Sequence, residues 1–206
     1  AKNLIFGGFD VSADLTVNST KVTVTDLTIR GNLVLSGSHV TATNLFLKGD
    51  LVMSGSRVTA AYLDVSGGQF TIDGTHITLQ NSTFDSQANC INKIQGSFHT
   101  VQNITIKDWT PQDVKSTPAV WVEAKSLLLT NCKYKQISYL SYRARFVFEK
   151  DGSSKNTYAQ NKCEWENDGY KPVMFFIQND PGNDKVCGSN IANAGDRTNI
   201  KVNYNC

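Results

Sequence analysis

An 18-residue segment occurs twice in succession, and it constrains the fold more than any other feature of the sequence. Residues 25–42 (TDLTIRGNLVLSGSHVTA) and 43–60 (TNLFLKGDLVMSGSRVTA) are identical at eleven of 18 positions. A looser form of the same pattern runs from about Leu4 to Leu79, with one inserted residue near Gly67. A unit this short cannot enclose an apolar core of its own, so the copies must stack on one another.

The spacing of the apolar residues shows what kind of unit is stacked. They lie two positions apart in each copy, in the pairs Leu27/Ile29, Leu33/Leu35 and Val40/Ala42. This is the period of a β-strand, because successive side chains leave opposite faces of an extended chain. Glycine-containing segments such as 30–32 and 36–38 separate the pairs and predict corners. The sequence therefore predicts an all-β fold, a parallel β-helix (β-solenoid) with coils of about 18 residues.

An antiparallel meander is the competing fold, but it does not explain identical residues every 18 positions. Beyond Leu79 the strand pattern continues with longer intervals, and Asn81, Asn103 and Asn131 are predicted to mark corners. From about Lys133 the repeat is lost. Because the end of a solenoid exposes unpaired backbone and needs a cap, we predict a solenoid over 1–132 and an irregular, disulfide-containing cap over 133–206.

Four of the five cysteines lie after residue 130, which favours an oxidised, disulfide-stapled region. The candidates for disulfides are Cys163, Cys187, Cys206 and Cys132. The connectivity stays open, the odd total leaves one thiol over, and buried reduced cysteines are the alternative. No CxxC pair occurs and the three histidines are scattered, so neither a metal site nor a cofactor is expected.

The charge balance excludes some classes of partner. Twenty basic and 18 acidic residues leave a net charge of +2, which favours neither nucleic acid nor a membrane surface. No apolar run approaches the ~20 residues of a membrane helix. Low charge in the first 100 residues, with abundant Ser, Thr, Asn and Gly, is typical of an exported solenoid. We therefore expect a secreted or cell-surface protein with a glycan or protein partner.

Stacking brings residues 18 apart close together, so columns of side chains are candidate binding surfaces. One column is basic and contains Lys21, His39, Arg57 and His76. It is interpreted either as a site for an anionic ligand (glycan, lipopolysaccharide or phosphate) or as a solvated corner that tolerates long polar side chains. In the predicted cap, Trp165 and Tyr170 are the aromatic residues most expected to be exposed for glycan or protein contact.

The catalytic alternative depends on two carboxylates. Asp85 and Asp108 follow equivalent predicted strands, and Lys107 with Arg143 or Arg145 could serve as a base or stabilise charge. No Ser-His-Asp set, nucleophile elbow or glycine-rich phosphate loop occurs. No catalytic residue is assigned, and a polysaccharide lyase or hydrolase is kept as the alternative.

The segment GNLVLSGSHVTATNLFLKGDLVMSGSRVTA (31–60) resembles the repeats of large exported bacterial β-solenoid proteins, the filamentous-haemagglutinin-like and autotransporter-passenger-like families. The resemblance covers about residues 4–79. It implies secretion, surface display, adhesion and a role in virulence, and it transfers no site residue. Bactofilins have a similar repeat style, but their cysteine-poor cytosolic character does not suit residues 133–206. A pilus-associated subunit would suit the cysteine-bearing end, although the hydrophobic pilin helix is absent.

Three functional hypotheses follow from these features. The first is a non-enzymatic secreted or cell-surface module that binds a glycan or protein on a host or neighbouring cell, as part of a surface appendage. The alternative is a polysaccharide-cleaving parallel β-helix enzyme. The second alternative is a structural spacer or filament subunit that stacks end to end.

Overall fold

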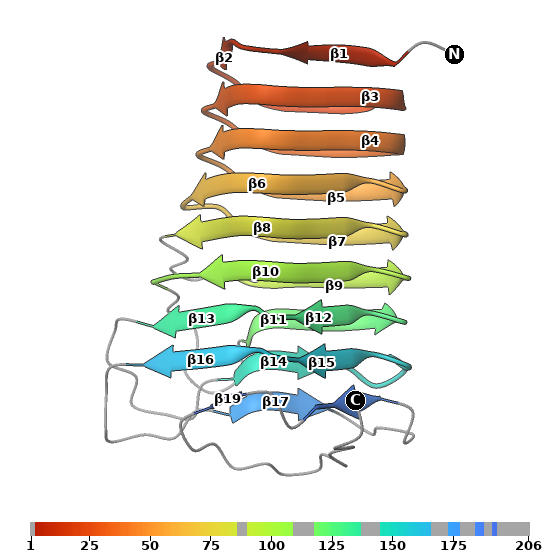
Figure 1. Ribbon diagram of the computed structural model, residues 1–206, viewed down its shortest axis with the longest axis vertical. Helices are drawn as coiled ribbons and strands as arrows, with labels where there is room; N and C mark the ends of the chain where they lie inside the picture. The colour runs from red at the N-terminus through yellow and green to blue at the C-terminus, as the bar shows by residue number, and fades with distance from the viewer. Residues whose placement is uncertain are drawn as a thin grey trace.

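The chain folds into a parallel β-solenoid in which each coil lies on the one before it (Figure 1). The structure is a computed structural model, and it describes residues 3–85, 90–108, 118–136, 145–165, 173–177, 184–187 and 191–192. The strands in these ranges pair in parallel with strands of the neighbouring coil. The predicted all-β parallel β-helix is therefore confirmed.

The strands are numbered in chain order and grouped here by coil. They are β1 (Leu4–Gly7) and β2 (Asp10–Val11); β3 (Leu15–Ile29); β4 (Leu33–Leu47); β5 (Leu51–Ser56) and β6 (Thr59–Ser66); β7 (Phe70–Thr75) and β8 (Thr78–Asp85); β9 (Asn92–Ser97) and β10 (Thr100–Ile106); β11 (Pro118–Lys125), β12 (Leu128–Thr130) and β13 (Lys133–Gln136); β14 (Arg145–Glu149), β15 (Thr157–Ala159) and β16 (Lys162–Trp165); and β17 (Val173–Ile177), β18 (Lys185–Val186) and β19 (Ile191–Ala192).

The 18-residue interval predicted from the repeat is the interval between residues that pair on neighbouring coils. Thr41 of β4 lies opposite Thr59 of β6, 18 residues later in the chain. Further along, Asn92 of β9 lies opposite Val120 of β11, 28 residues later. The later coils keep the same strands and corners and lengthen the connections between them. The period therefore disappears from the sequence while the stack continues.

Each coil has corners at residues with left-handed backbone. In β3 these are Lys21 (φ 58°) and Asp26 (φ 55°). The prediction of a corner at segment 36–38 is wrong by one residue, because the chain turns at His39, whose φ is 58°. Glycine is needed at position 37 because of the neighbouring coil. A Cβ added at this position would lie 2.1 Å from the carbonyl oxygen of Ser19 on the preceding coil.

The asparagine corners predicted from the sequence are confirmed. Asn81, Asn103 and Asn131 share one corner, with φ of 51°, 54° and 52°. Asn103 Nδ2 donates to Asn81 Oδ1 at 2.8 Å, and Asn131 Nδ2 donates to Asn103 Oδ1. Asparagine suits this position because it tolerates the left-handed conformation and its amide bonds to the next copy.

The interior of the solenoid is filled by columns of apolar side chains, one from each coil. One column consists of Leu35, Met53, Ile72, Ile94 and Val122, all with 0% exposure. Burying an aliphatic side chain of this size contributes about 1.5–3 kcal/mol. The columns therefore supply the stability that no single coil could reach alone.

The stack does not end at residue 132, where the sequence predicted the solenoid to stop. β14, β15 and β16 pair in parallel with β11, β12 and β13 respectively, and β17–β19 continue the same order. Residues 145–149 and 173–177 are strands that belong to the coils (Figure 1). A cap formed by the rest of 133–206 falls outside the described residues.

Candidate functional site

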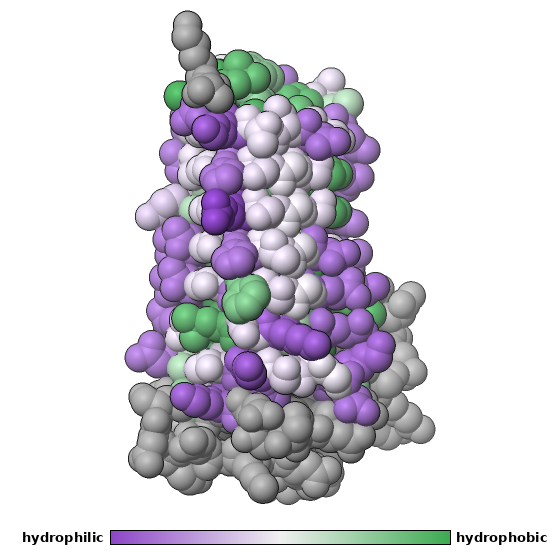
Figure 2. Space-filling view, turned by 90° about the vertical axis from the view of Figure 1, so that its right-hand side faces the viewer, coloured by the Kyte–Doolittle hydropathy of each residue, from purple (hydrophilic) through white to green (hydrophobic). Residues whose placement is uncertain are grey.

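The four basic residues predicted to form a column share one edge of the stack. Lys21, His39, Arg57 and His76 are the left-handed residues of one corner, with φ between 56° and 58°, and all four are exposed. Arg57 Nη1 lies 3.1 Å from His39 Nε2 on the coil before. Figure 2 shows this edge as a vertical line of hydrophilic side chains. Whether the column binds a ligand stays a prediction.

Several other predicted site residues have side chains outside the described part of the chain. Trp165 ends β16, and Cys163 in the same strand pairs with Tyr134, but only their backbones are described. Tyr170 and Cys206 lie wholly outside it. Their proposed contacts and disulfides stay predictions.

Cys132 is wrong as a disulfide candidate. Its thiol is free and 2% exposed, and burial raises its pKa to about 12. The register places it at the inward position that Ile104 fills one coil earlier, where cysteine packs as a small apolar side chain. Cys90 is likewise not part of a disulfide, whereas Cys187 is buried and disulfide-bonded.

The carboxylates considered for catalysis, Asp85 and Asp108, lie where the equivalent strands β8 and β10 end. Lys107 Nζ is 3.9 Å from Asp85 Oδ2, and the two side chains are 42% and 38% exposed. Asp108 follows Lys107 with a left-handed backbone (φ 50°). The structure therefore brings Asp85 and Lys107 together as a solvent-exposed ion pair, while the side chains of Arg143 and Arg145 are not described.

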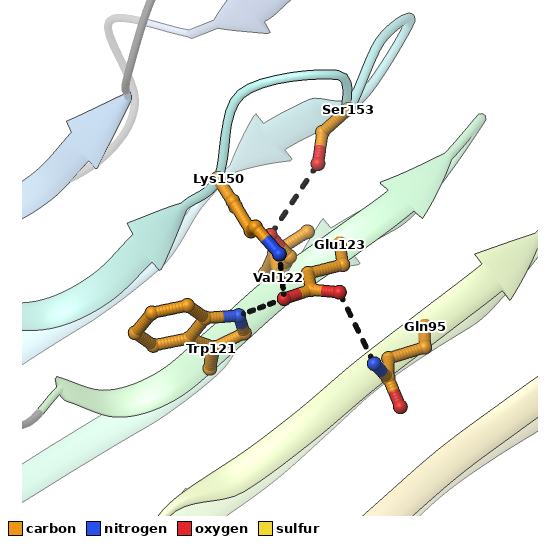
Figure 3. A network of polar contacts seen from close by, with 6 residues as sticks. All are labelled: Gln95, Trp121, Val122, Glu123, Lys150 and Ser153. Atoms are coloured by element: carbon orange, nitrogen blue, oxygen red, sulfur yellow. Dashed lines mark hydrogen bonds and ion pairs between the residues drawn. The ribbon is translucent and has the colours of Figure 1, made fainter.

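A polar and aromatic cluster on the outer surface of β9 and β11 was not identified from the sequence. In β11 inward residues alternate with the outward residues Trp121 and Glu123, because successive side chains leave opposite faces of a strand. The register places Gln95 of β9 opposite Glu123, and Lys150 directly follows β14 on the next coil. Three neighbouring coils therefore meet at the Glu123 carboxylate (Figure 3).

Glu123 accepts hydrogen bonds from three side chains. Trp121 Nε1 and Lys150 Nζ donate to Oε1 at 2.8 Å and 2.9 Å, and Gln95 Nε2 donates to Oε2 at 3.2 Å (Figure 3). The bond from Lys150 is the main cause that lowers the pKa of Glu123, and the bonds from Trp121 and Gln95 act in the same direction. A carboxylate held ionised in this way orients its neighbours and accepts hydrogen bonds, and it is unsuited to donate a proton.

Trp121 lies between two coils with its indole at the surface. Lys93 of β9 is its partner in the register on one side, and Phe148 of β14 on the other. The Trp121 and Phe148 ring centroids are 4.6 Å apart at an interplanar angle of 41°. Because the bond to Glu123 orients the indole, this ring is a fixed aromatic surface. The sequence signal was the alternation Val-Trp-Val-Glu-Ala, which places a large ring outward on a strand.

A second carboxyl with a shifted pKa lies inside the solenoid. Glu149 is 1% exposed, and burial raises its pKa to about 8, with a further contribution from the neighbouring Asp184 carboxylate. The hydroxyl of the fully buried Tyr158 donates to Glu149 Oε2. This group is a proton-binding part of the core, without the exposure that a substrate would require.

Other kinds of site are not seen in the part of the chain that the structure describes. It contains no group of three or more His, Cys, Asp or Glu side chains that could hold a metal ion. It also contains no helix long and apolar enough to cross a membrane.

Comparison with known proteins adds little to this picture. No protein-family model matches the chain, and no curated protein matches it. A solved structure described as a glycoside hydrolase is similar over 80% of this chain and 39% of its own length, with a TM-score of 0.32 and 11% sequence identity. This chain therefore spans well under half the length of that structure.

Proposed function

We propose that this chain is a non-enzymatic carbohydrate-recognition module that acts in adhesion, secreted or displayed at a cell surface. The observation that carries the proposal is the partly exposed Trp121 indole, held by Glu123 on the outside of a rigid stack. A sugar ring presents an apolar C–H face and a rim of hydroxyl groups. An oriented indole beside amide, ammonium and carboxylate groups is complementary to both.

The same proposal covers the wider setting that the repeat pattern suggests. The partner is a glycan, or a glycosylated protein, on a host or neighbouring cell. An exported bacterial surface structure, including an appendage, is the setting implied by the resemblance of residues 31–60. The rigid solenoid would hold the binding surface at a fixed distance from its point of attachment.

The electrostatics of the described residues favour binding over cleavage. Glycoside hydrolysis generally needs a pair of accessible carboxyls, one of which has a raised pKa and acts as the acid. Glu123 has a lowered pKa, and Glu149, whose pKa is raised, is buried in the core. Neither group meets both requirements.

Binding is tested with Trp121→Ala and a matched aromatic control. Tyr62→Ala removes a more exposed ring (59% exposed) that lies at a corner of an earlier coil. A glycan array with the wild-type protein identifies bound sugars, and titration calorimetry then compares the variants. We expect Trp121→Ala to weaken binding at least about tenfold and Tyr62→Ala to leave it unchanged. Equal affinity of Trp121→Ala and wild type, or no glycan bound by wild type, would overturn the proposal.

The polysaccharide-cleaving alternative rests on the exposed Asp85–Lys107 pair with Asp108 beside it. It is tested by assaying release of new reducing ends from polysaccharides that the protein binds. Activity that disappears in both Asp85→Asn and Asp108→Asn would establish the enzyme and displace the binding module.

A further inference from the structure

The basic corner has a regular geometry along the solenoid axis. The register aligns Thr20, Ser38, Ser56 and Thr75, the residues that immediately precede Lys21, His39, Arg57 and His76. Each basic residue is therefore one coil from the next, a step of about 4.8 Å. All four side chains are exposed. We call these four residues the basic strip; they lie along the edge that faces the viewer in Figure 2.

The corner itself does not require basic residues. A left-handed backbone favours Gly, Asn and Asp over other residue types. The other corner of the same coils follows that preference at three of its four positions, with Asp26, Asn44 and Asn81 in the left-handed conformation and Tyr62 as the exception. Asn44 Nδ2 donates to Asp26 Oδ1 at 3.2 Å. The basic strip has Lys, His, Arg and His in its place. Backbone geometry therefore leaves the chemistry of this edge unexplained.

The surroundings of the strip leave its charge available. On both sides it is flanked by hydroxyl-bearing residues in register, which are Thr20, Ser38, Ser56 and Thr75 before the corner and Thr23, Thr41, Thr59 and Thr78 after it. The nearest carboxylate in the strands beside it is Asp73, three residues before His76. No ion pair involving the strip is seen among the described residues, whereas other charged side chains, such as Lys107 with Asp85, are paired.

We propose that the basic strip binds an extended acidic polysaccharide whose chain runs parallel to the solenoid axis. Basic side chains at a uniform axial spacing, with the permanent charges of Lys21 and Arg57 among them, are complementary to a polymer that carries carboxylate or sulfate groups at regular intervals. The coil step is close to the advance of one pyranose residue in an extended chain. The flanking hydroxyl groups can bond to sugar hydroxyls between the charges.

The C-terminal end of the strip adds an aromatic contact. The His76 ring stacks on Phe98 of the next coil, with centroids 5.0 Å apart and an angle of 17°. Phe98 continues the same corner with φ 60° and is 57% exposed. Its free face is an apolar surface suited to a sugar ring. This feature favours a polysaccharide over a simple polyphosphate.

Hydrogen bonds within the strip order its side chains. Arg57 Nη1 donates to His39 Nε2 at 3.1 Å, and His39 Nδ1 lies 2.8 Å from Ser38 Oγ. These contacts hold the His39 and Arg57 side chains next to each other along the corner.

The test removes two permanent charges from the strip and compares an equal removal elsewhere. The double variant Lys21→Gln/Arg57→Gln changes the strip. The double variant Arg30→Gln/Lys48→Gln removes the same charge from exposed positions where one coil passes into the next. Glutamine is tolerated at a left-handed corner of this solenoid, as Gln160 shows (φ 55°). Circular dichroism and melting temperature establish that both double variants remain folded.

The probes are heparin and polygalacturonate, with neutral dextran and double-stranded DNA as comparisons, and binding is followed by fluorescence anisotropy. We expect wild type to bind at least one of the two acidic polysaccharides more tightly than dextran or DNA. The strip variant should bind about tenfold more weakly than wild type, and the Arg30/Lys48 variant within about twofold. Equal losses in both double variants, no binding of either acidic polysaccharide, or tighter binding of DNA would overturn the proposal.

This inference goes beyond the Trp121 surface and can fail independently of it. Trp121→Ala is expected to leave heparin and polygalacturonate binding unchanged, because Trp121 lies on a later coil and away from the corner. Suppose that Trp121→Ala loses neutral-glycan binding while the strip variant binds acidic polysaccharides as well as wild type does. That result would retain the proposed function and reject the strip as a binding site.

Discussion

At the scale of single residues, Glu149 is the side chain least expected from its position. It continues the inward column of Leu35, Met53, Ile72, Ile94 and Val122, because Val122 and Glu149 are partners in the register. A buried carboxyl is tolerated when it is protonated and hydrogen-bonded. The Tyr158 hydroxyl supplies one such bond, and the raised pKa keeps the proton bound near neutral pH.

The raised pKa of Glu149 predicts that stability falls as pH rises. The unfolded chain releases the proton near the ordinary value of 4.5, whereas the folded protein holds it up to about pH 8. Between these values the unfolded state binds fewer protons, so the free energy of unfolding declines by up to about 1.4 kcal/mol per pH unit. Glu149→Gln keeps a neutral polar side chain, and we expect it to remove most of this decline in urea unfolding measured at intervals from pH 5 to 8.

Glu123→Gln is the matched control for this experiment. The pKa of Glu123 is lowered, so its stabilising contribution is present above its ordinary range and is lost only as the medium becomes acidic. We expect Glu123→Gln to retain the wild-type decline between pH 5 and 8. A Glu149→Gln profile parallel to wild type would show that Glu149 is already ionised in the folded state.

At the scale of the structural elements, close backbone approach between coils explains a column of glycines on one side of the solenoid. Gly37, Gly55, Gly74 and Gly96 occupy the same position on successive coils. A Cβ added to Gly74 would lie 2.2 Å from the Gly55 carbonyl oxygen. The adjacent coil must move if any side chain is placed there.

Two substitutions separate close approach from backbone conformation. Gly74 has no left-handed φ, so Gly74→Ala tests the contact alone, whereas Gly67 has φ +83° with nothing within 4 Å of an added Cβ. We expect Gly67→Ala to cost about 1–2 kcal/mol from backbone strain. Gly74→Ala should cost about 3 kcal/mol or more, because the clash is with backbone of the neighbouring coil. Chemical denaturation checks both, and an equal loss in the two variants would reject the role of close approach.

At the scale of the whole molecule, the first coil leaves a strand edge open among the described residues. β1 and β2 pair only with β3 there, and Leu4, Ile5 and Phe9 are 60%, 66% and 48% exposed. An unpaired edge with exposed apolar side chains is a template for pairing with another chain. If the alternative of an end-to-end spacer or filament subunit holds, we expect copies of this chain to pair through this edge.

Self-association through this end is tested with Ile5→Lys, because a charge on an edge strand opposes pairing with another chain. Tyr62→Lys places the same charge at an exposed position on the side of the stack. Analytical ultracentrifugation over a range of concentrations should show association of the wild type and of Tyr62→Lys, and much less of Ile5→Lys. Monomers throughout for the wild type would count against a filament subunit.

The repeat was enough to predict the coil and its strand positions, and the asparagines beyond it were enough to predict one corner. Leu33, Leu51 and Phe70 follow the register inferred from their spacing, and Asn81, Asn103 and Asn131 form the corner that they were expected to mark. These features follow from local rules, because strand period and left-handed corners depend on residue type and interval. The strand register was visible where the interval stayed near 18 residues, and the asparagine corner was visible even at intervals of 22 and 28 residues.

The features that depend on contacts between coils of unequal length were not predictable in this way. Gln95, Glu123 and Lys150 meet at one carboxylate although 28 and 27 residues separate them, because longer connections shift the sequence interval while the strands stay in register. Because of the same change in interval, the sequence did not predict that the stack continues past residue 132 or that Glu149 lies at an inward position. Residue intervals thus account for how one coil is built, whereas the partners of a side chain on the next coil are set by connection length and packing, which no local pattern records.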